Sequence, residues 1–176
     1  ILQDVLGYEL GEIKTEQKIQ GRIADYVLAP GGQEALVIEA KRLGAPLRDK
    51  QIFQATSYAA YAGLRWAVLT NVMTWLLYRV STKDKVEANL VFTLDLSNLD
   101  DESVYRLMLI SKAGITRCDL LEKVWQKKAA LSQESLMAAI LNEDVLNKIR
   151  MVLMRERGCP LTPLEIQDAI ERELLR

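Results

Sequence analysis

The sequence of 176 residues contains no histidine. This absence excludes Ser-His-Asp and Cys-His catalytic arrangements, histidine general bases, and zinc sites built from cysteine and histidine. Any catalysis would therefore run on carboxylates, lysine, tyrosine or a metal held by oxygen atoms. The G-x-x-x-x-G-K-[ST] motif is also missing, so these residues include no nucleotide-driven motor.

Cysteines are few, and long apolar runs are missing. Cys118 and Cys159 lie far apart without the spacing of metal ligands, so we interpret them as free thiols in a reducing, cytoplasmic compartment. No apolar run approaches about 18 residues, so we expect no transmembrane helix and no membrane partner. No signal peptide is visible, although the chain opens at Ile1 without methionine.

The net charge is also small. Lysine and arginine number 23 and aspartate and glutamate 24, which gives a formal charge of -1 at pH 7. A dedicated high-affinity nucleic-acid binder is usually more basic than this. The first part of the chain nevertheless has enough basic residues to form a local positive groove: Lys14, Lys18, Arg22, Lys41, Arg42, Arg48 and Lys50.

The apolar pattern separates the chain into a part rich in strands and a helical part. Strands are expected within residues 11–21, 22–29, 34–41, 65–71, 74–80 and 86–96, with one helix within residues 50–63 and the end of another at residues 1–7. From Asp100 onward, helical periodicity with caps continues to the end of the sequence. We therefore predict an α/β or α+β core over residues 1–96, followed by a helical C-terminal extension over residues 97–176. In the extension, four apolar residues recur at helical spacing and are interpreted as core or otherwise as an interface: Trp125, Leu136, Met137 and Ile140.

Ionisable residues interrupt two strands that otherwise look buried. Asp25 lies in the strand pattern of residues 22–29, and Glu39 and Lys41 end the pattern of residues 34–41. The turn between them allows two hairpin registers, which place Asp25 opposite either Ile38 or Glu39 and bring the two carboxylates together in both cases. Facing carboxylates resist burial unless a cation joins them, and two hard oxygen ligands suit Mg²⁺. The alternative is ordinary: a solvated strand edge for Glu39 and Lys41, and a hydrogen-bonded turn residue for Asp25.

The predicted helix of residues 50–63 adds two polar candidates. Gln54 and Tyr58 are spaced at i and i+4, so they lie on one face of the helix. An amide and a phenol near Lys41 are able to contact a phosphate or order a water molecule. Tyr58 alone is better interpreted as a core aromatic residue than as a site residue, and Gln51 competes with Gln54 for the polar role.

Together, Asp25, Glu39-x-Lys41 and Gln54-x-x-x-Tyr58 resemble the PD-(D/E)xK nuclease superfamily. The segments "ADYVL", "VIEAKR", "QATSYA" and "VLTNVMTWLLY" resemble more narrowly the N-terminal nuclease domain of type I restriction enzyme motor (R) subunits, over about residues 1–95. The resemblance implies a restriction-endonuclease-like mixed sheet with flanking helices. It departs from the family at Ala24, where proline usually precedes the aspartate. The additional acidic residue of the family has no assigned counterpart, since the chain offers only Asp4 and Glu16 nearby.

The resemblance also implies roles for the site residues. Asp25 and Glu39 would bind a metal ion with the Ala40 carbonyl as third ligand. Lys41 would be the catalytic lysine, and Gln54 and Tyr58 the accessory catalytic pair that engages DNA. The cofactor would be Mg²⁺, with Mn²⁺ able to substitute.

Two functional hypotheses follow. The first is a Mg²⁺-dependent DNA endonuclease whose partners are DNA and either a second copy of the chain or a separate translocase or specificity subunit. The second is a catalytically silent nuclease fold that serves only to bind DNA or protein. The sequence does not separate DNA from RNA as the substrate.

Overall fold

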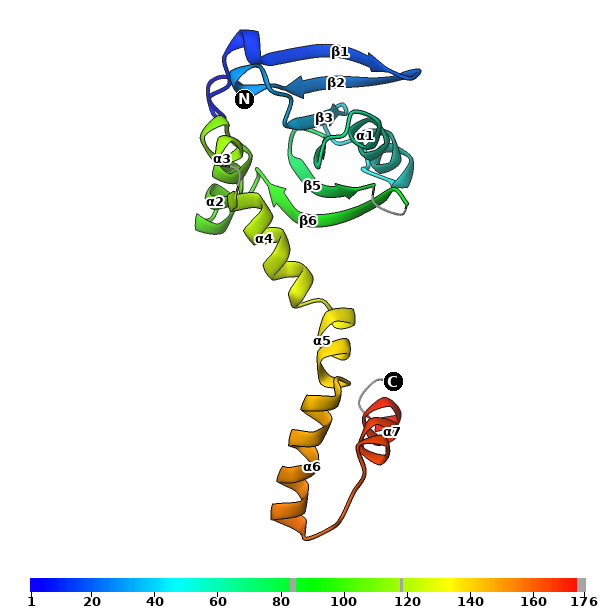
Figure 1. The fold of residues 1–176 in the computed structure, drawn as a ribbon. Coiled ribbons are helices and arrows are strands. Elements are labelled where there is room, and N and C mark those ends of the chain that lie inside the picture. Colours follow the sequence, from blue (N-terminus) through cyan, green and yellow to red (C-terminus); the bar gives the residue numbers. More distant parts are fainter. Residues whose placement is uncertain (83–84, 118, 174–176) are drawn as a thin grey trace. The chain divides into compact units, whose positions relative to one another are not determined.

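The computed structural model describes residues 1–82, 85–117 and 119–173 (Figure 1). Six strands of these residues form one mixed sheet whose spatial order follows the sequence order. The strands are β1 (Ile13–Ile19), β2 (Arg22–Leu28), β3 (Leu36–Ala40), β4 (Trp66–Thr70), β5 (Thr74–Ser81) and β6 (Glu87–Asp95). The predicted fold class is thereby confirmed: a mixed sheet with flanking helices, followed by helices toward the C-terminus.

The connection between β3 and β4 places the loops that follow these two strands at the same edge of the sheet. These two strands run parallel, whereas the other neighbouring pairs are antiparallel. A parallel pair needs a crossover connection, and the helix α1 (Asp49–Tyr61) supplies it. Gly63, with φ of +69°, follows the end of α1, as the sequence predicts. Because β3 and β4 are parallel, their carboxyl ends lie at the same edge of the sheet.

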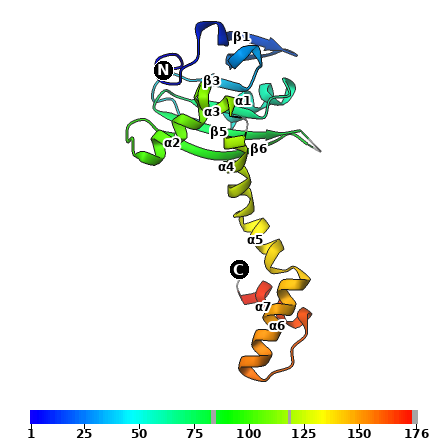
Figure 2. The same cartoon turned by 60° about the vertical axis from the view of Figure 1, so that its left-hand side comes forward.

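Two apolar cores cover the two faces of the sheet, because successive strand residues point to opposite faces. On one side, Val37 of β3 lies in a core with Ala55, Tyr58 and Ala59 of α1. The other side is covered by α2 (Asp101–Ile110), α3 (Lys112–Thr116) and the first part of α4 (Asp119–Ala130) (Figures 1 and 2). This second core includes Leu36, Ile38, Leu109, Ile110 and Leu121.

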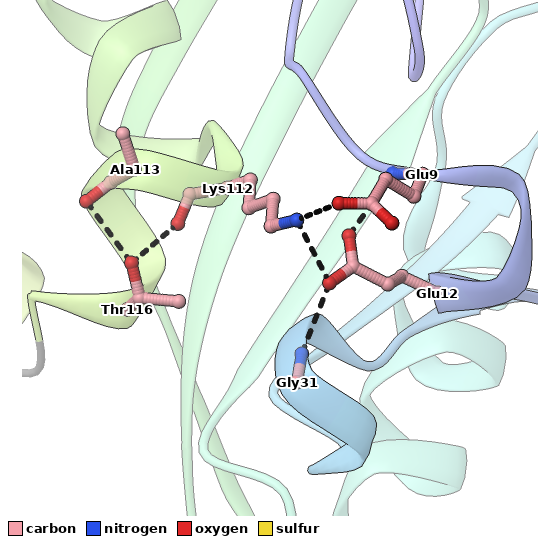
Figure 3. Close-up of polar contacts among 6 residues, drawn as sticks. All are labelled: Glu9, Glu12, Gly31, Lys112, Ala113 and Thr116. Atoms are coloured by element: carbon pink, nitrogen blue, oxygen red, sulfur yellow. Dashed lines mark hydrogen bonds and ion pairs between the residues drawn. The ribbon is translucent and has the colours of Figure 1, made fainter.

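Residues 1–12 are tied to α2 and α3 by polar contacts. The backbone amide of Lys112 donates a hydrogen bond of 2.8 Å to the carbonyl oxygen of Leu6. Its ammonium group lies 2.7 Å from Oε1 of Glu9 and 3.0 Å from Oε1 of Glu12 (Figure 3). Glu12 also accepts a 3.0 Å hydrogen bond from the backbone amide of Gly31. These contacts join segments that lie about a hundred residues apart in the sequence.

The structure differs from the sequence prediction at the start of the chain. Residues 2–6 form turns rather than the end of an amphipathic helix, and a short 3-10 helix follows at Leu10–Glu12. Gly7 has a φ of +75°, which reverses the chain. The apolar residues that suggested a helix instead reach the core individually, since Leu6 and Tyr8 are each 2% exposed.

The first compact unit of the chain extends to Trp125, and the second covers Gln126–Arg176. The predicted division between residues 96 and 97 follows from the change of apolar pattern along the sequence and stays a prediction. Residues beyond 96 nevertheless belong to the compact core of the sheet, because Leu109, Ile110 and Leu121 lie in it. None of the helices in the described ranges is long and apolar enough to cross a membrane.

The second unit contains α5 (Gln133–Ile140), α6 (Glu143–Arg157) and α7 (Pro163–Glu173). Ser132 caps α5 as expected, by accepting a hydrogen bond from the amide of Ser135. The core interpretation is wrong for Leu136 and Ile140, which are 44% and 39% exposed. Trp125 instead borders the core of the first unit. Cys159 is an exposed free thiol, whereas Cys118 lies outside the described residues.

Candidate functional site

The site is built on the hairpin of β2 and β3. Its register pairs Tyr26 with Ile38 and Leu28 with Leu36, so the next pair in the same register places Asp25 opposite Glu39. Of the two registers that the sequence allowed, the one centred on Gly32 is therefore correct. Because side chains alternate along a strand, Glu39 faces the same side of the sheet as Val37, the side that α1 covers.

Hydrogen bonds hold the acidic and basic groups in place. The backbone amide of Ala40 donates a 2.7 Å hydrogen bond to Oδ2 of Asp25. The ammonium group of Lys41 contacts Oε1 of Glu39, and the backbone amide of Lys41 donates to the carbonyl oxygen of Thr70 over 2.7 Å. In the described part of the chain, Oδ1 of Asp25 and Oε2 of Glu39 have no protein donor. Each carboxylate therefore keeps one oxygen for a ligand.

Glu39 is the most deeply buried charged residue of the site, with 1% of its surface exposed. Burial raises the pKa of this carboxyl group above its usual value; the hydrogen bond from Lys41 lowers it, and the charge of Asp25 raises it again. The net direction is upward, so burial makes the charged form of Glu39 less favourable than it is in water. A second positive charge at this place would offset this effect of burial.

An open hollow of about 430 Å³ adjoins Asp25 and is lined by Thr15, Glu16, Asp25, Tyr26 and Ala40. Glu16 received no role from the sequence. The register of β1 and β2, which pairs Thr15 with Tyr26 and Gln17 with Ala24, places Glu16 opposite Asp25. Its φ of +48° departs from strand geometry. The only sequence signal for this residue was an acidic side chain in a presumed strand.

The donor set fits a hard divalent cation. Carboxylate oxygens are the ligands that Mg²⁺ prefers, and Mg²⁺ commonly uses one or two carboxylates and completes its shell with water. Among residues 1–82, 85–117 and 119–173, no three aspartate, glutamate, histidine or cysteine side chains are arranged to hold a metal ion. If Asp25 and Glu39 held such an ion, the remaining positions would fall to water, a carbonyl oxygen or substrate.

Gln54 and Tyr58, both predicted to belong to the site, lie differently on α1. Gln54 is exposed. Tyr58 is 4% exposed and packs in the core between α1 and the sheet. Burial raises the pKa of Tyr58, the charge of Glu34 raises it further, and that of Lys14 lowers it. Lys14 of β1 and Glu34, which precedes β3, form an ion pair of 2.8 Å. The core interpretation of Tyr58 therefore describes its packing, and no described contact joins it to Lys41.

The competitor Gln51 is occupied within α1. Its side-chain oxygen accepts a 3.2 Å hydrogen bond from the backbone amide of Arg48, at the start of the helix. This contact is part of a capping arrangement. Gln51 therefore has a structural role, and Gln54 is the exposed amide of the two.

The turn between β4 and β5 closes the same edge of the sheet. Asn71 donates a 2.9 Å hydrogen bond from its side-chain nitrogen to the carbonyl oxygen of Ala45, in the loop after β3. Its side-chain oxygen accepts a 2.8 Å hydrogen bond from the amide of Thr74. One side chain thus connects the loop that follows Lys41 to the turn that follows Thr70.

Comparison with known proteins gives the family. Residues 1–93 match the family described as type I restriction enzyme R protein N terminus (HSDR_N). A search of solved structures returns the type IIG restriction endonuclease BpuSI, with 18% sequence identity and a TM-score of 0.42. That match covers 86% of this chain and 20% of the BpuSI chain, so the chain spans about a fifth of the length of that enzyme. None of the curated proteins compared matches the chain. Since the family match extends over more than half of the 176 residues, the chain belongs to the family of type I restriction enzyme R protein N-terminal regions.

Proposed function

We propose that this chain is a divalent-metal-dependent endonuclease domain that hydrolyses phosphodiester bonds in DNA. The observation that supports it most directly is the arrangement at the carboxyl end of β3. There the buried carboxylate of Glu39 lies beside Lys41 and under the electrostatic influence of Asp25. DNA is proposed as the substrate because the family is that of restriction enzyme subunits.

In this proposal Asp25 and Glu39 hold the metal ion through their free oxygens, with the Ala40 carbonyl as a further ligand. Mg²⁺, or Mn²⁺ in its place, would polarise the bound phosphate and lower the pKa of a coordinated water molecule. The ammonium group of Lys41 is anchored at Oε1 of Glu39. From there it donates a hydrogen bond to the attacking water or offsets the charge that develops on the phosphate oxygens.

The accessory residues take separate parts in this proposal. Gln54 is exposed on α1 and is proposed to contact the DNA. Tyr58 is enclosed between α1 and the sheet, so its proposed contribution is to hold α1 in position. Glu16 lies in the same hollow as Asp25 and is proposed to bind a water molecule of the metal ion.

Nicking of supercoiled plasmid DNA with Mg²⁺ tests the activity. Glu39→Ala and Lys41→Ala should lose cleavage, because one removes a metal ligand and the other the ammonium group. The matched controls are Glu87→Ala and Lys85→Ala, which break an exposed ion pair of 3.2 Å with the same two-residue spacing. Controls should cut like the unchanged protein. If the Glu39 and Lys41 variants also cut like it, the catalytic assignment is wrong.

The second candidate is a silent nuclease fold that binds DNA or protein without cutting. Two observations favour it: Lys41 closes onto Glu39, and no group of three metal-binding side chains is found within the described ranges. Calorimetric titration with Mn²⁺ separates the candidates. The endonuclease proposal expects binding that Asp25→Asn and Glu39→Gln both weaken, whereas the silent fold expects no heat of binding at these residues.

A further inference from the structure

Beyond the site, two segments that a hydrogen bond connects carry three exposed apolar residues, Leu43, Val72 and Met73, which together we call the tip. Leu43 lies in the loop after β3, two residues after Lys41, and thus within about 7 Å of it along the chain. Val72 and Met73 form the turn after β4. The hydrogen bond from Asn71 to Ala45 joins the two segments.

The three residues of the tip are apolar and exposed. Leu43 is 65%, Val72 42% and Met73 38% exposed. Exposed apolar residues on connected loops cost little when single, but a group of them beside a functional site indicates an interaction. The tip is therefore a candidate interaction surface.

The turn of the tip is held rigidly in an unusual conformation. Val72 has a φ of +78°, which is rare for a β-branched residue and costs conformational energy. Three hydrogen bonds maintain it: the Val72 amide donates to Oγ1 of Thr70 at 3.0 Å, Oγ1 of Thr70 donates to the Thr74 carbonyl at 2.9 Å, and the Trp75 indole donates to the Val72 carbonyl at 2.9 Å. The side chains of the tip are thus presented by a preformed support.

Positive charge lies on either side of Leu43 along the chain, with Arg42 and Arg48 between β3 and α1 and Lys50 in the first turn of α1. Arg42, Arg48 and Lys50 are exposed, and none of them forms an ion pair within the described ranges. DNA is complementary to this combination: its phosphates match the free guanidinium and ammonium groups, and its stacked bases match the apolar residues. Proteins that kink DNA use this combination, with an apolar wedge between base steps and arginine on the backbone.

Resting on the proposed function, we propose that the tip enters the DNA beside the bound phosphate and unstacks one base step. The same polymer reaches both places, because the tip begins two residues beyond Lys41. Arg42 and Arg48 bind the phosphates on either side, and Leu43 and Met73 contact the separated bases. A protein partner is the less favoured occupant, because the charge around the tip is entirely basic in residues 41–50 apart from Asp49.

The test uses the full chain with a duplex that carries 2-aminopurine, a base whose fluorescence rises when it is unstacked. Ca²⁺ replaces Mg²⁺, and a gel confirms that the duplex stays intact. Fluorescence should rise on binding, and Leu43→Ser and Met73→Ser should lose most of the rise when the duplex is saturated with protein. Leu10→Ser is the matched control, since Leu10 is 74% exposed and lies outside the tip.

Arg42→Ala tests the phosphate contact separately. It should weaken binding and reduce the slope of log affinity against log salt by about 1. If the fluorescence rise is the same in the two serine variants as in the unchanged protein, the tip does not enter the duplex, and the proposal is overturned. Plasmid nicking with Mg²⁺ then tells whether the endonuclease proposal survives alone. A chain that binds no DNA at all overturns both proposals.

Discussion

The hydroxyl group of Tyr8 donates a 2.8 Å hydrogen bond to the carbonyl oxygen of Ile110, in the interior of the protein. Ile110 is the last residue of α2, so its carbonyl has no partner within the helix. Burial raises the pKa of Tyr8, with a further increase from the charge of Glu12, and the hydroxyl group stays protonated as a donor. A residue near the start of the sequence thereby satisfies the last carbonyl group of α2, a helix that comes after all six strands in the sequence.

Tyr8→Phe should therefore lower stability. The carbonyl oxygen of Ile110 would stay buried without a donor, which costs about 1–3 kcal/mol. For a protein of this size, each 1 kcal/mol corresponds to a fall in Tm of about 2–4 °C. Thermal unfolding followed by circular dichroism measures the change. Tyr105→Phe on α2 is the control, because Tyr105 is 44% exposed and should give an unchanged Tm. Equal melting of both variants would contradict a role for the Tyr8 hydrogen bond.

Gly114→Ala tests the close approach of α3 to α2. A Cβ atom at Gly114 would lie 2.1 Å from the carbonyl oxygen of Met108 and 2.6 Å from that of Leu109. Backbone atoms would have to move, so we expect a loss of at least about 1–3 kcal/mol in the free energy of unfolding. Gly11→Ala is the matched control, since a Cβ atom there meets nothing within 4 Å. Urea unfolding of both variants gives the comparison, and a stable Gly114→Ala protein would refute the packing of α2 and α3.

The carboxylate of Glu12 should make stability depend on pH. Backbone amides of Glu9 and then of Gly31 lower its pKa, burial opposes them, and Lys112 adds to the lowering. A lowered pKa in the folded protein means that the stabilisation is present above the unfolded pKa of about 4.3 and is lost as the pH falls through the folded value. Glu12→Gln should accordingly melt earlier than the unchanged protein at pH 7.

The difference should shrink as the pH falls through the lowered folded-state pKa of Glu12, below which its carboxyl group is protonated in both states. Thermal melts between about pH 7 and pH 3 measure it. Glu9→Gln is the control, because Glu9 contacts the same ammonium group but is 77% exposed, and such pairs contribute little. A gap between Glu12→Gln and the unchanged protein that stays constant over this range would rule out the carboxylate as its cause.

Glu39→Gln should separate stability from function. Burial is the first cause of the raised pKa of Glu39, so removing the charge should raise the Tm at neutral pH in a chelating buffer, by about 2–4 °C for 1 kcal/mol of relief. With Mn²⁺ the order should reverse, because a metal that binds only the folded, charged site stabilises it. Calorimetric melts with and without Mn²⁺ measure both effects, and Glu87→Gln, on the exposed surface, should respond to neither.

The pattern of the sequence predicted much of the first compact unit. Alternation indicated β1, apolar runs bounded by turn residues indicated the other strands, and the helical spacing of apolar residues located α1. Asp25, Glu39 and Lys41 stood out as candidate site residues because ionisable residues rarely interrupt a buried strand, and their roles stay a prediction. The sequence left two hairpin registers that differ by one residue. The turn between the strands has positive φ at Gly31 (+62°) and Gly32 (+85°), and the observed pairing places Tyr26 opposite Ile38.

Other features had no local signal. The helix α3 has five residues, which is too short to show a period. Tyr58 has the spacing of a site residue, but which end of the sheet its hydroxyl group approaches depends on the direction of α1 over β3. The exposure of Leu136 and Ile140 follows from the small size of the second unit, which buries Leu146 and Ile166 and has little further interior. Such features depend on tertiary contacts that no single segment encodes.

The agreement between strand order and sequence order has a consequence for synthesis on the ribosome. Each emerging strand finds its neighbour already translated, so the hairpin of Asp25 and Glu39 can form early in the nascent chain. The apolar side that carries Leu36 and Ile38 then stays uncovered until Leu109 and Ile110 have been made. During this interval the unfinished sheet is the stretch of the polypeptide most open to chaperone capture or to pairing with a neighbouring nascent chain.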